Sequence, residues 1–174
     1  IITASHNPSE YNGLKMTFNK ASLSEEQIKE VKEHTQKAYE DVKADKYRTF
    51  RCGFVKKYDI ISNYTDKISD MFDKIGNGIK IVVDSANATG GLVAPQLYRE
   101  LGCEVVELFS EPDGNFPNHP PNPSDEKTLD AIKKAVVENK AVFGIAFDGD
   151  TDRIGEVSSK GKTISGDKLL LICA

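Results

Sequence analysis

The pattern of apolar and polar residues predicts a strand followed by a long helix in the first part of the chain. Residues 14–18 alternate between apolar and polar side chains, the period of a half-buried strand, which places Lys15 on the polar face. Ser24 and Gln27 then occupy the positions of a capping box. A stripe of apolar residues follows at helical spacing: Ile28, Val31, Ala38 and Val42. We therefore expect a helix from about Ser24 to Ala44.

Helical and strand patterns alternate in the second part of the chain. We interpret the polar residues 45–57 as a connection between two domains, and expect a helix from Tyr58 to Ile75 that ends at Gly76. Further expected elements are strands at 79–84, 104–109 and 142–147, helices at 92–101 and 124–139 (the latter capped by Ser124), and a hairpin at 154–164. This order predicts an α/β fold: a three-layer, mainly parallel sheet flanked by helices, in one complete domain plus partial neighbouring domains.

Composition and charge narrow the classes of function. The 174 residues are 39% hydrophobic and carry a formal net charge of -4, with no basic stretch for nucleic acid or a membrane surface. The three cysteines, Cys52, Cys103 and Cys173, are spaced like neither a disulfide framework nor a zinc site. No apolar run approaches a membrane span. We expect a cytoplasmic protein without nucleic-acid or membrane partners.

A candidate metal site follows the apolar run 142–147. Asp148-Gly149-Asp150-Thr151-Asp152-Arg153 places acidic residues at alternate positions beyond a strand end, where α/β sheets bind ligands. Converging carboxylates repel one another unless a cation neutralises them, and Mg²⁺ prefers oxygen ligands. Two alternatives are a solvated acidic turn and an aspartyl nucleophile at Asp148. An EF-hand is disfavoured, because Arg153 and Ser159 stand where it needs Gly and Glu.

A candidate nucleophile lies in Thr3-Ala4-Ser5-His6-Asn7-Pro8. Ser5 offers a hydroxyl on a polar turn, although Ser, Asn and Pro are also ordinary turn residues. Pro8 fits the first position of a short helix, whose amides would face a phosphate on Ser5. Such a phosphate would add an oxygen ligand to the metal site. His6 is a candidate acid, base or phosphate contact, and Lys15 is either a proton acceptor in the same pocket or an ordinary exposed lysine.

Two other segments are weaker candidates. Asp84 and the turn at residues 87–91 follow a strand, but without a Gly-x-Gly-x-x-Gly spacing a structural turn is favoured over a phosphate site. The proline-rich loop 111–123 should be stiff, and its polar part is a candidate border of the site. His119 in this loop either orients the loop or contacts a ligand.

Three motifs in this order resemble the α-D-phosphohexomutase family. They are the segment around Ser5 with Tyr11-Asn12-Gly13-Leu14-Lys15, the segment 113–123, and the acidic segment 148–153. The second half of the first motif is similar to the phosphomannomutase/phosphoglucomutase branch more than to phosphoglucosamine mutases. The resemblance implies that Ser5 gives and regains a phosphoryl group. It also implies one Mg²⁺ bound by the Ser5 phosphate, Asp148, Asp150 and Asp152, proton transfer by Lys15, and phosphate contacts from His6 and Arg153.

The resemblance also implies an isomerase reaction and an incomplete chain. The family interconverts hexose 1-phosphate and hexose 6-phosphate, of glucose or mannose, through a hexose 1,6-bisphosphate that is both intermediate and activator. Its members have four domains, so we expect residues 1–50 to end domain 1, 51–157 to form domain 2, and 158–174 to begin domain 3. The chain starts without Met and stops within an apolar run, as an interior piece would, and by itself it is expected to be inactive. The rivals are an aspartyl phosphatase and a non-catalytic sugar-phosphate or metal-binding module.

Overall fold

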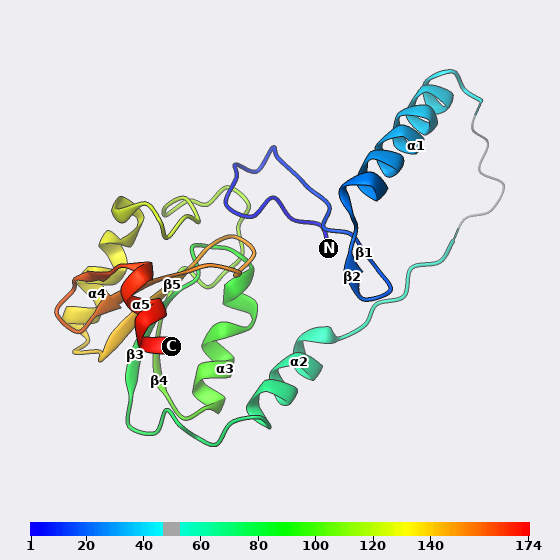
Figure 1. Ribbon diagram of the computed structural model, residues 1–174. Coiled ribbons are helices and arrows are strands. Elements are labelled where there is room, and N and C mark those ends of the chain that lie inside the picture. The colour runs from blue at the N-terminus through cyan, green and yellow to red at the C-terminus, as the bar shows by residue number, and fades with distance from the viewer. Residues whose placement is uncertain (47–52) are drawn as a thin grey trace. The chain divides into compact units, whose positions relative to one another are not determined.

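The computed structural model describes residues 1–46 and 53–174, which form two compact units (Figure 1). The first unit contains Ile1–Ile2 and Leu14–Tyr58, and the second contains Thr3–Gly13 and Asp59–Ala174. The middle of the predicted connection, with Cys52, lies outside the described residues. Within the described ranges, no helix combines the length and the apolar character needed to cross a membrane.

The first unit consists of a small hairpin and one long helix. Strand β1 (Thr17–Phe18) pairs antiparallel with β2 (Ala21–Ser22), and helix α1 spans Glu25–Lys43. The predicted capping box is confirmed, because the Ser24 hydroxyl accepts from the Gln27 amide and the Gln27 side chain accepts from the Ser24 amide. These reciprocal bonds fix the start of the helix.

The predicted half-buried strand at 14–18 is wrong in both length and burial. Only two of its residues lie in β1, and Leu14 and Phe18 are 67% and 64% exposed. The apolar stripe of α1 is likewise not buried, since that helix contains no buried residue. Within the described part of this unit, the hairpin and α1 are the only elements, so these side chains have no second layer to pack against.

The second unit is built on a five-stranded sheet with the order β4-β3-β5-β6-β7. Its strands are β3 (Lys80–Asp84), β4 (Glu104–Leu108), β5 (Phe143–Phe147), β6 (Ile154–Ser158) and β7 (Thr163–Ile164). Strands β4, β3 and β5 are parallel, whereas β6 and β7 form the predicted antiparallel hairpin. The predicted α/β class is confirmed, and the sheet is mixed because this hairpin extends the parallel strands.

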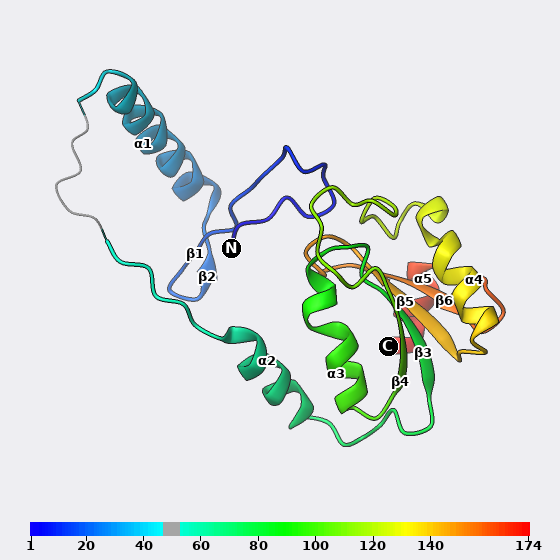
Figure 2. The ribbon, with the colours of Figure 1, turned by 180° about the vertical axis from the view of Figure 1, so that it is seen from behind.

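Helices cover both faces of this sheet (Figures 1 and 2). Helix α3 (Ala94–Glu100) follows the 3₁₀ turn η1 (Thr89–Leu92) and packs on one face, and α4 (Asp130–Glu138) follows η2 (Glu126–Leu129) and packs on the other. Helix α2 (Ile60–Ser69) contacts α3, and α5 (Gly166–Cys173) contains no buried residue. In β3, Ile81 and Val83 pack with residues of α3, and Val82 packs with residues of α4. This alternation follows the period of a strand and produces the predicted three layers.

Two predicted helix boundaries are wrong. Helix α2 ends at Ser69 rather than Ile75, because the following chain turns toward the sheet and the Gly76 amide donates to the Leu101 carbonyl oxygen over 2.9 Å. The helix expected at 124–139 begins with the 3₁₀ turn η2, and its cap is Asp125 rather than Ser124. The Asp125 carboxylate accepts from the Lys127 amide over 3.0 Å, so it satisfies an N-terminal donor that Ser124 does not reach.

Candidate active site

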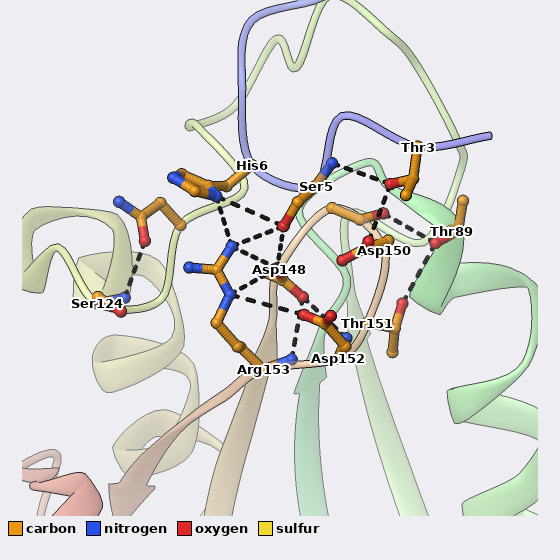
Figure 3. Close-up of polar contacts among 12 residues, drawn as sticks. Thr3, Ser5, His6, Thr89, Ser124, Asp148, Asp150, Thr151, Asp152 and Arg153 are labelled. Carbon is orange, nitrogen blue, oxygen red and sulfur yellow. Dashed lines mark hydrogen bonds and ion pairs between the residues drawn. The ribbon is translucent and has the colours of Figure 1, made fainter. Parts of the chain in front are cut away.

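Asp148 organises the acidic loop that follows β5. Its carboxylate is completely buried, and its Oδ1 accepts from the backbone amides of Asp152 and Arg153 over 3.0 and 3.1 Å. Its Oδ2 accepts from Nε of Arg153 over 3.0 Å (Figure 3). A charged acceptor compensated by these donors is stable in the interior, and it fixes the path of the loop around itself.

Ser5 lies on a turn beside this loop. Its hydroxyl donates to Oδ2 of Asp148 over 2.9 Å and accepts from Nη2 of Arg153 over 2.7 Å (Figure 3). The helix expected after Pro8 is not formed. Instead, the amide of Asn7 bonds to the Ala4 carbonyl oxygen, and Ser5 has a left-handed φ of 52°. The hydroxyl is thus held by side chains from the acidic loop, not by a helix terminus.

His6 also contacts Arg153. Its Nδ1 lies 2.5 Å from Nη2 of Arg153 and 3.5 Å from the Ser5 hydroxyl oxygen. A guanidinium can only donate hydrogen bonds, so Nδ1 accepts and the ring proton of a neutral His6 must lie on Nε2. The structure therefore brings together Ser5, His6, Asp148 and Arg153.

Thr3 connects the Ser5 turn to a second carboxylate. Its hydroxyl donates to Oδ2 of Asp150 and accepts from the Ser5 amide, each over 2.9 Å. No role for Thr3 was predicted from the sequence. A Ser or Thr hydroxyl often accepts from a backbone amide two residues later, so the position of Thr3 two residues before Ser5 could have indicated this bond.

Thr89 and Gly149 complete the contacts around the acidic loop. Thr89, at the start of η1, donates to the Gly149 carbonyl oxygen over 2.8 Å and lies 3.3 Å from the Thr151 hydroxyl oxygen. Gly149 packs directly on the Ser5 backbone, and a Cβ at Gly149 would overlap the Ser5 carbonyl oxygen. The turn at 87–91, expected to be structural, thus supports the acidic loop.

The donor set of this loop fits a hard divalent cation. Asp148, Asp150 and Asp152 each offer a carboxylate oxygen, and the three oxygens lie within 4.8 Å of one another. Oxygen-only donors at such spacing suit Mg²⁺ or a similar ion. The three residues could hold a metal ion, and the Ser5 hydroxyl oxygen contacts one of the three carboxylates.

The structure disfavours Asp148 as a nucleophile and leaves the role of Lys15 untested. Asp148 is a poor nucleophile, because it is completely buried and both of its oxygens accept hydrogen bonds. Lys15 belongs to the first unit, where its amide donates to the Ile1 carbonyl oxygen over 2.8 Å. Its role in proton transfer stays a prediction.

Comparisons with protein families match most of the chain. Residues 62–161 match the model described as "Phosphoglucomutase/phosphomannomutase, alpha/beta/alpha domain II". Residues 1–42 match the corresponding model of domain I. The domain I match precedes the domain II match along the chain.

Individual relatives and a solved structure agree with these matches. The chain is 41% identical over 175 aligned residues to a phosphomannomutase/phosphoglucomutase of Pseudomonas putida, and 42% identical over 174 to a phosphoglucomutase of Neisseria gonorrhoeae. Both alignments cover 100% of this chain and 36% of the relative. A crystal structure of a phosphoglucomutase/phosphomannomutase family protein from Burkholderia thailandensis superposes with a TM-score of 0.80 at 36% identity, over 99% of this chain and 36% of that protein. The chain therefore spans about a third of the length of these relatives.

Proposed function

Because the chain belongs to the phosphoglucomutase/phosphomannomutase family, we propose that it supplies the phosphoryl-transfer site of a phosphohexomutase. The intact enzyme would interconvert the 1-phosphate and 6-phosphate of glucose or mannose, with a small phosphosugar as its partner. The observation that carries this proposal is the Ser5 hydroxyl held between Asp148 and Arg153. Because this chain spans 36% of its relatives, the activity is proposed for the intact protein and not for these residues alone.

The proposal includes an assignment of domains. Residues 1–50 would end domain 1 and carry Ser5, residues 51–157 would form domain 2 with the acidic loop, and residues 158–174 would begin domain 3. The matched ranges 1–42 and 62–161 support the order of the first two. The boundary at residue 50 lies outside the described residues.

Ser5 would carry the phosphoryl group between half-reactions. The phosphorylated side chain would transfer its group to a hydroxyl of the bound sugar phosphate, which gives a hexose 1,6-bisphosphate. The proton that the sugar hydroxyl loses balances the proton that the Ser5 oxygen takes up to become a hydroxyl again. The bisphosphate, which would also act as activator, would then reorient and return its other phosphoryl group to Ser5. Arg153 already donates to the Ser5 oxygen, and that position suits it to stabilise the charge on this oxygen as it leaves.

The remaining site residues would hold the cation and move a proton. Asp148, Asp150, Asp152 and the phosphate on Ser5 would bind one Mg²⁺, which neutralises the charge of the transferred group when bound. Lys15 would accept the proton of the sugar hydroxyl. His6, whose Nδ1 contacts Arg153, would help orient that guanidinium and the phosphate. We place the intact enzyme in the cytoplasm, as the cysteine pattern predicts.

The experiment that tests the proposal is to locate the transferred phosphate. The intact protein is incubated with ³²P-labelled hexose 1,6-bisphosphate and Mg²⁺, and the labelled peptide is then sequenced. We expect an acid-stable phosphate on Ser5 that disappears in Ser5→Ala and persists in Ser9→Ala, a matched serine of the same segment. A hydroxylamine-sensitive label that survives Ser5→Ala would support the aspartyl phosphatase instead. No label in any variant would support the non-catalytic binding module.

A further inference from the structure

His119 fixes the proline-rich loop 111–123 to the end of strand β3. Its Nε2 lies 3.1 and 3.2 Å from the two carboxylate oxygens of Asp84, the last residue of that strand. Its Nδ1 lies 2.9 Å from the carbonyl oxygen of Pro120. Both partners can only accept hydrogen bonds, so both ring nitrogens must carry protons and the ring is an imidazolium when both bonds are made.

This ion pair leaves His119 without a ring nitrogen for a ligand. Asp84 is completely buried, and the His119 side chain is only 13% exposed. The edge of the imidazole ring also packs on Phe109, with ring centres 5.4 Å apart at an angle of 76°. Of the two roles considered for His119, the contacts therefore favour orientation of the loop over binding of a ligand.

Asn87 provides a second anchor for the same loop. Its amide donates to the Phe109 carbonyl oxygen and its carbonyl oxygen accepts from the Asp113 amide, each over 2.8 Å. Its side-chain amide donates to the Glu111 carbonyl oxygen over 2.8 Å, and its side-chain oxygen accepts from Asn118 over 2.7 Å. The backbone amide, backbone carbonyl, side-chain amide and side-chain oxygen of Asn87 thus all bind residues at or next to the loop. Because Asn does not titrate, the pair of Asp84 and His119 is the anchor whose strength depends on pH.

The anchored loop forms one wall of a cavity beside Ser5. The cavity measures about 250 Å³ and lies between the loop and the segment that follows Ser5. One side is lined by His6, Asn7, Pro8 and Ser9, and the other by Gly114, Asn115, Phe116, Pro120 and Pro121. Pro120, which accepts the His119 bond, is therefore itself part of the wall.

We propose that Asp84 and His119 are positioning residues whose ion pair holds the loop 111–123 against the segment His6–Ser9 and so keeps Ser5 aligned for phosphoryl transfer. The loop-holding step stands on the contacts above. The alignment step rests on the proposed function. Neither residue touches the Ser5 hydroxyl in the contacts described, so both act through the loop.

The protonation of His119 makes the proposal pH-dependent. Burial by itself lowers the pKa of His119, but the hydrogen bonds to Asp84 and Pro120 and the charge of Asp84 outweigh it, so the pKa lies above its usual 6.5. Among the described residues that contact the ring, Asp84 on β3 is the titratable group, because Phe109 and the Pro120 carbonyl do not titrate. The folded state thus holds the proton more tightly. The added stability is complete below pH 6.5 and is lost as pH rises through the raised pKa.

The first arm of the test follows the loop by NMR in the intact protein. The pKa of His119 should lie above the usual value of 6.5. His34, a 77%-exposed histidine on α1, provides the comparison for the variants. The protection factors of the Asp113 and Phe116 amides should fall about tenfold as pH rises through the His119 pKa, whereas an amide of β5 should not change. The Asp84→Asn variant should lower the pKa of His119. If His119 titrates at or below its usual value, or the loop protection is pH-independent, the ion-pair anchor is overturned.

The second arm measures the alignment of Ser5 by kinetics. In His119→Gln we expect kcat to fall about tenfold with KM for the phosphosugar little changed, and the alkaline limb of the kcat profile that matches the His119 pKa to disappear. The matched variant His34→Gln should behave as the unaltered enzyme. An unchanged kcat profile in His119→Gln, with the NMR result intact, overturns the alignment step. Failure of the proposed function is distinguishable, because it would remove the Ser5 phosphate and leave the NMR arm unaffected.

Discussion

The Ser5 hydroxyl lies 2.9 Å from Oδ2 of Asp148, although 143 positions separate the two residues in the sequence. The bond requires the Ser5 hydroxyl proton, which a phosphorylated Ser5 no longer has. A phosphate beside a buried carboxylate would instead place more negative charge there than the single guanidinium of Arg153 can neutralise, which favours a further cation. If Ser5 is phosphorylated as proposed, this contact would link its phosphorylation to the binding of a metal ion by the same loop.

This link predicts that phosphorylation of Ser5 increases metal affinity. The phosphate adds oxygen ligands and negative charge next to Asp148, so we expect Mg²⁺ to bind the phosphorylated intact protein at least about tenfold more tightly than the unphosphorylated form. Isothermal titration of both forms measures the difference. The Asp148→Asn variant should lose most of this affinity, and Asp130→Asn on α4 serves as a matched control. Equal affinities of the two forms would contradict the link.

Gly149 is predicted to be essential for the position of Ser5. A Cβ at Gly149 would overlap the Ser5 carbonyl oxygen and lie 2.8 Å from the carbonyl carbon, and a backbone cannot yield as a flexible side chain does. We expect Gly149→Ala to lower kcat/KM of the intact enzyme by about 100-fold, because a displaced nucleophile loses its alignment. Gly166→Ala at the start of α5 is the control, since a Cβ there has no neighbour within 4 Å. Steady-state kinetics measures the effect. Full activity of Gly149→Ala would contradict the prediction, because it would mean that the Ser5 turn can move away from the acidic loop without loss of activity.

The planar guanidinium of Arg153 is predicted to matter beyond its charge. Its Nε bonds to Oδ2 of Asp148 over 3.0 Å, and its Nη2 reaches the same oxygen at 2.8 Å and the Ser5 oxygen at 2.7 Å. Lysine has one nitrogen and cannot span both partners. We expect Arg153→Lys to reduce kcat of the intact enzyme by about 10- to 100-fold, with Arg99→Lys on α3 as the control. Wild-type rates in Arg153→Lys would mean that charge alone suffices.

Features encoded by neighbouring residues could be predicted from the sequence. Strands β3 and β5 are short runs of buried apolar residues, and the capping box at Ser24 depends on residues three positions apart. The acidic loop was placed correctly at the end of β5, because a strand in an α/β sheet delivers the residues that follow it to one edge.

Features that depend on distant partners could not be predicted. The roles of Thr3 and Thr89 require knowledge of where Asp150 and Gly149 lie in space, which no local pattern contains. The Asp84 and His119 pair is formed across 35 positions by a loop whose prolines indicate stiffness but not where it docks. Helix α2 was predicted too long for a similar reason, since its end depends on the contact of Gly76 with Leu101.

The last prediction concerns Asn87 as an anchor of the loop 111–123. Asn87 has a φ of 55°, a left-handed conformation that Asn tolerates better than Ala. Asn87→Ala loses two side-chain hydrogen bonds and adds strain, so we expect the free energy of unfolding to fall by about 2–4 kcal/mol in urea titrations.

Two further variants separate these causes. Asn87→Gly loses the same bonds without the strain and should be about 1 kcal/mol less destabilised than Asn87→Ala. Asn139→Ala, which loses a single side-chain bond at the end of α4 where φ is -87°, should cost less than about 1.5 kcal/mol. If Asn87→Ala costs no more than Asn139→Ala, the loop does not depend on Asn87. The Asp84 and His119 pair would then carry the anchoring alone.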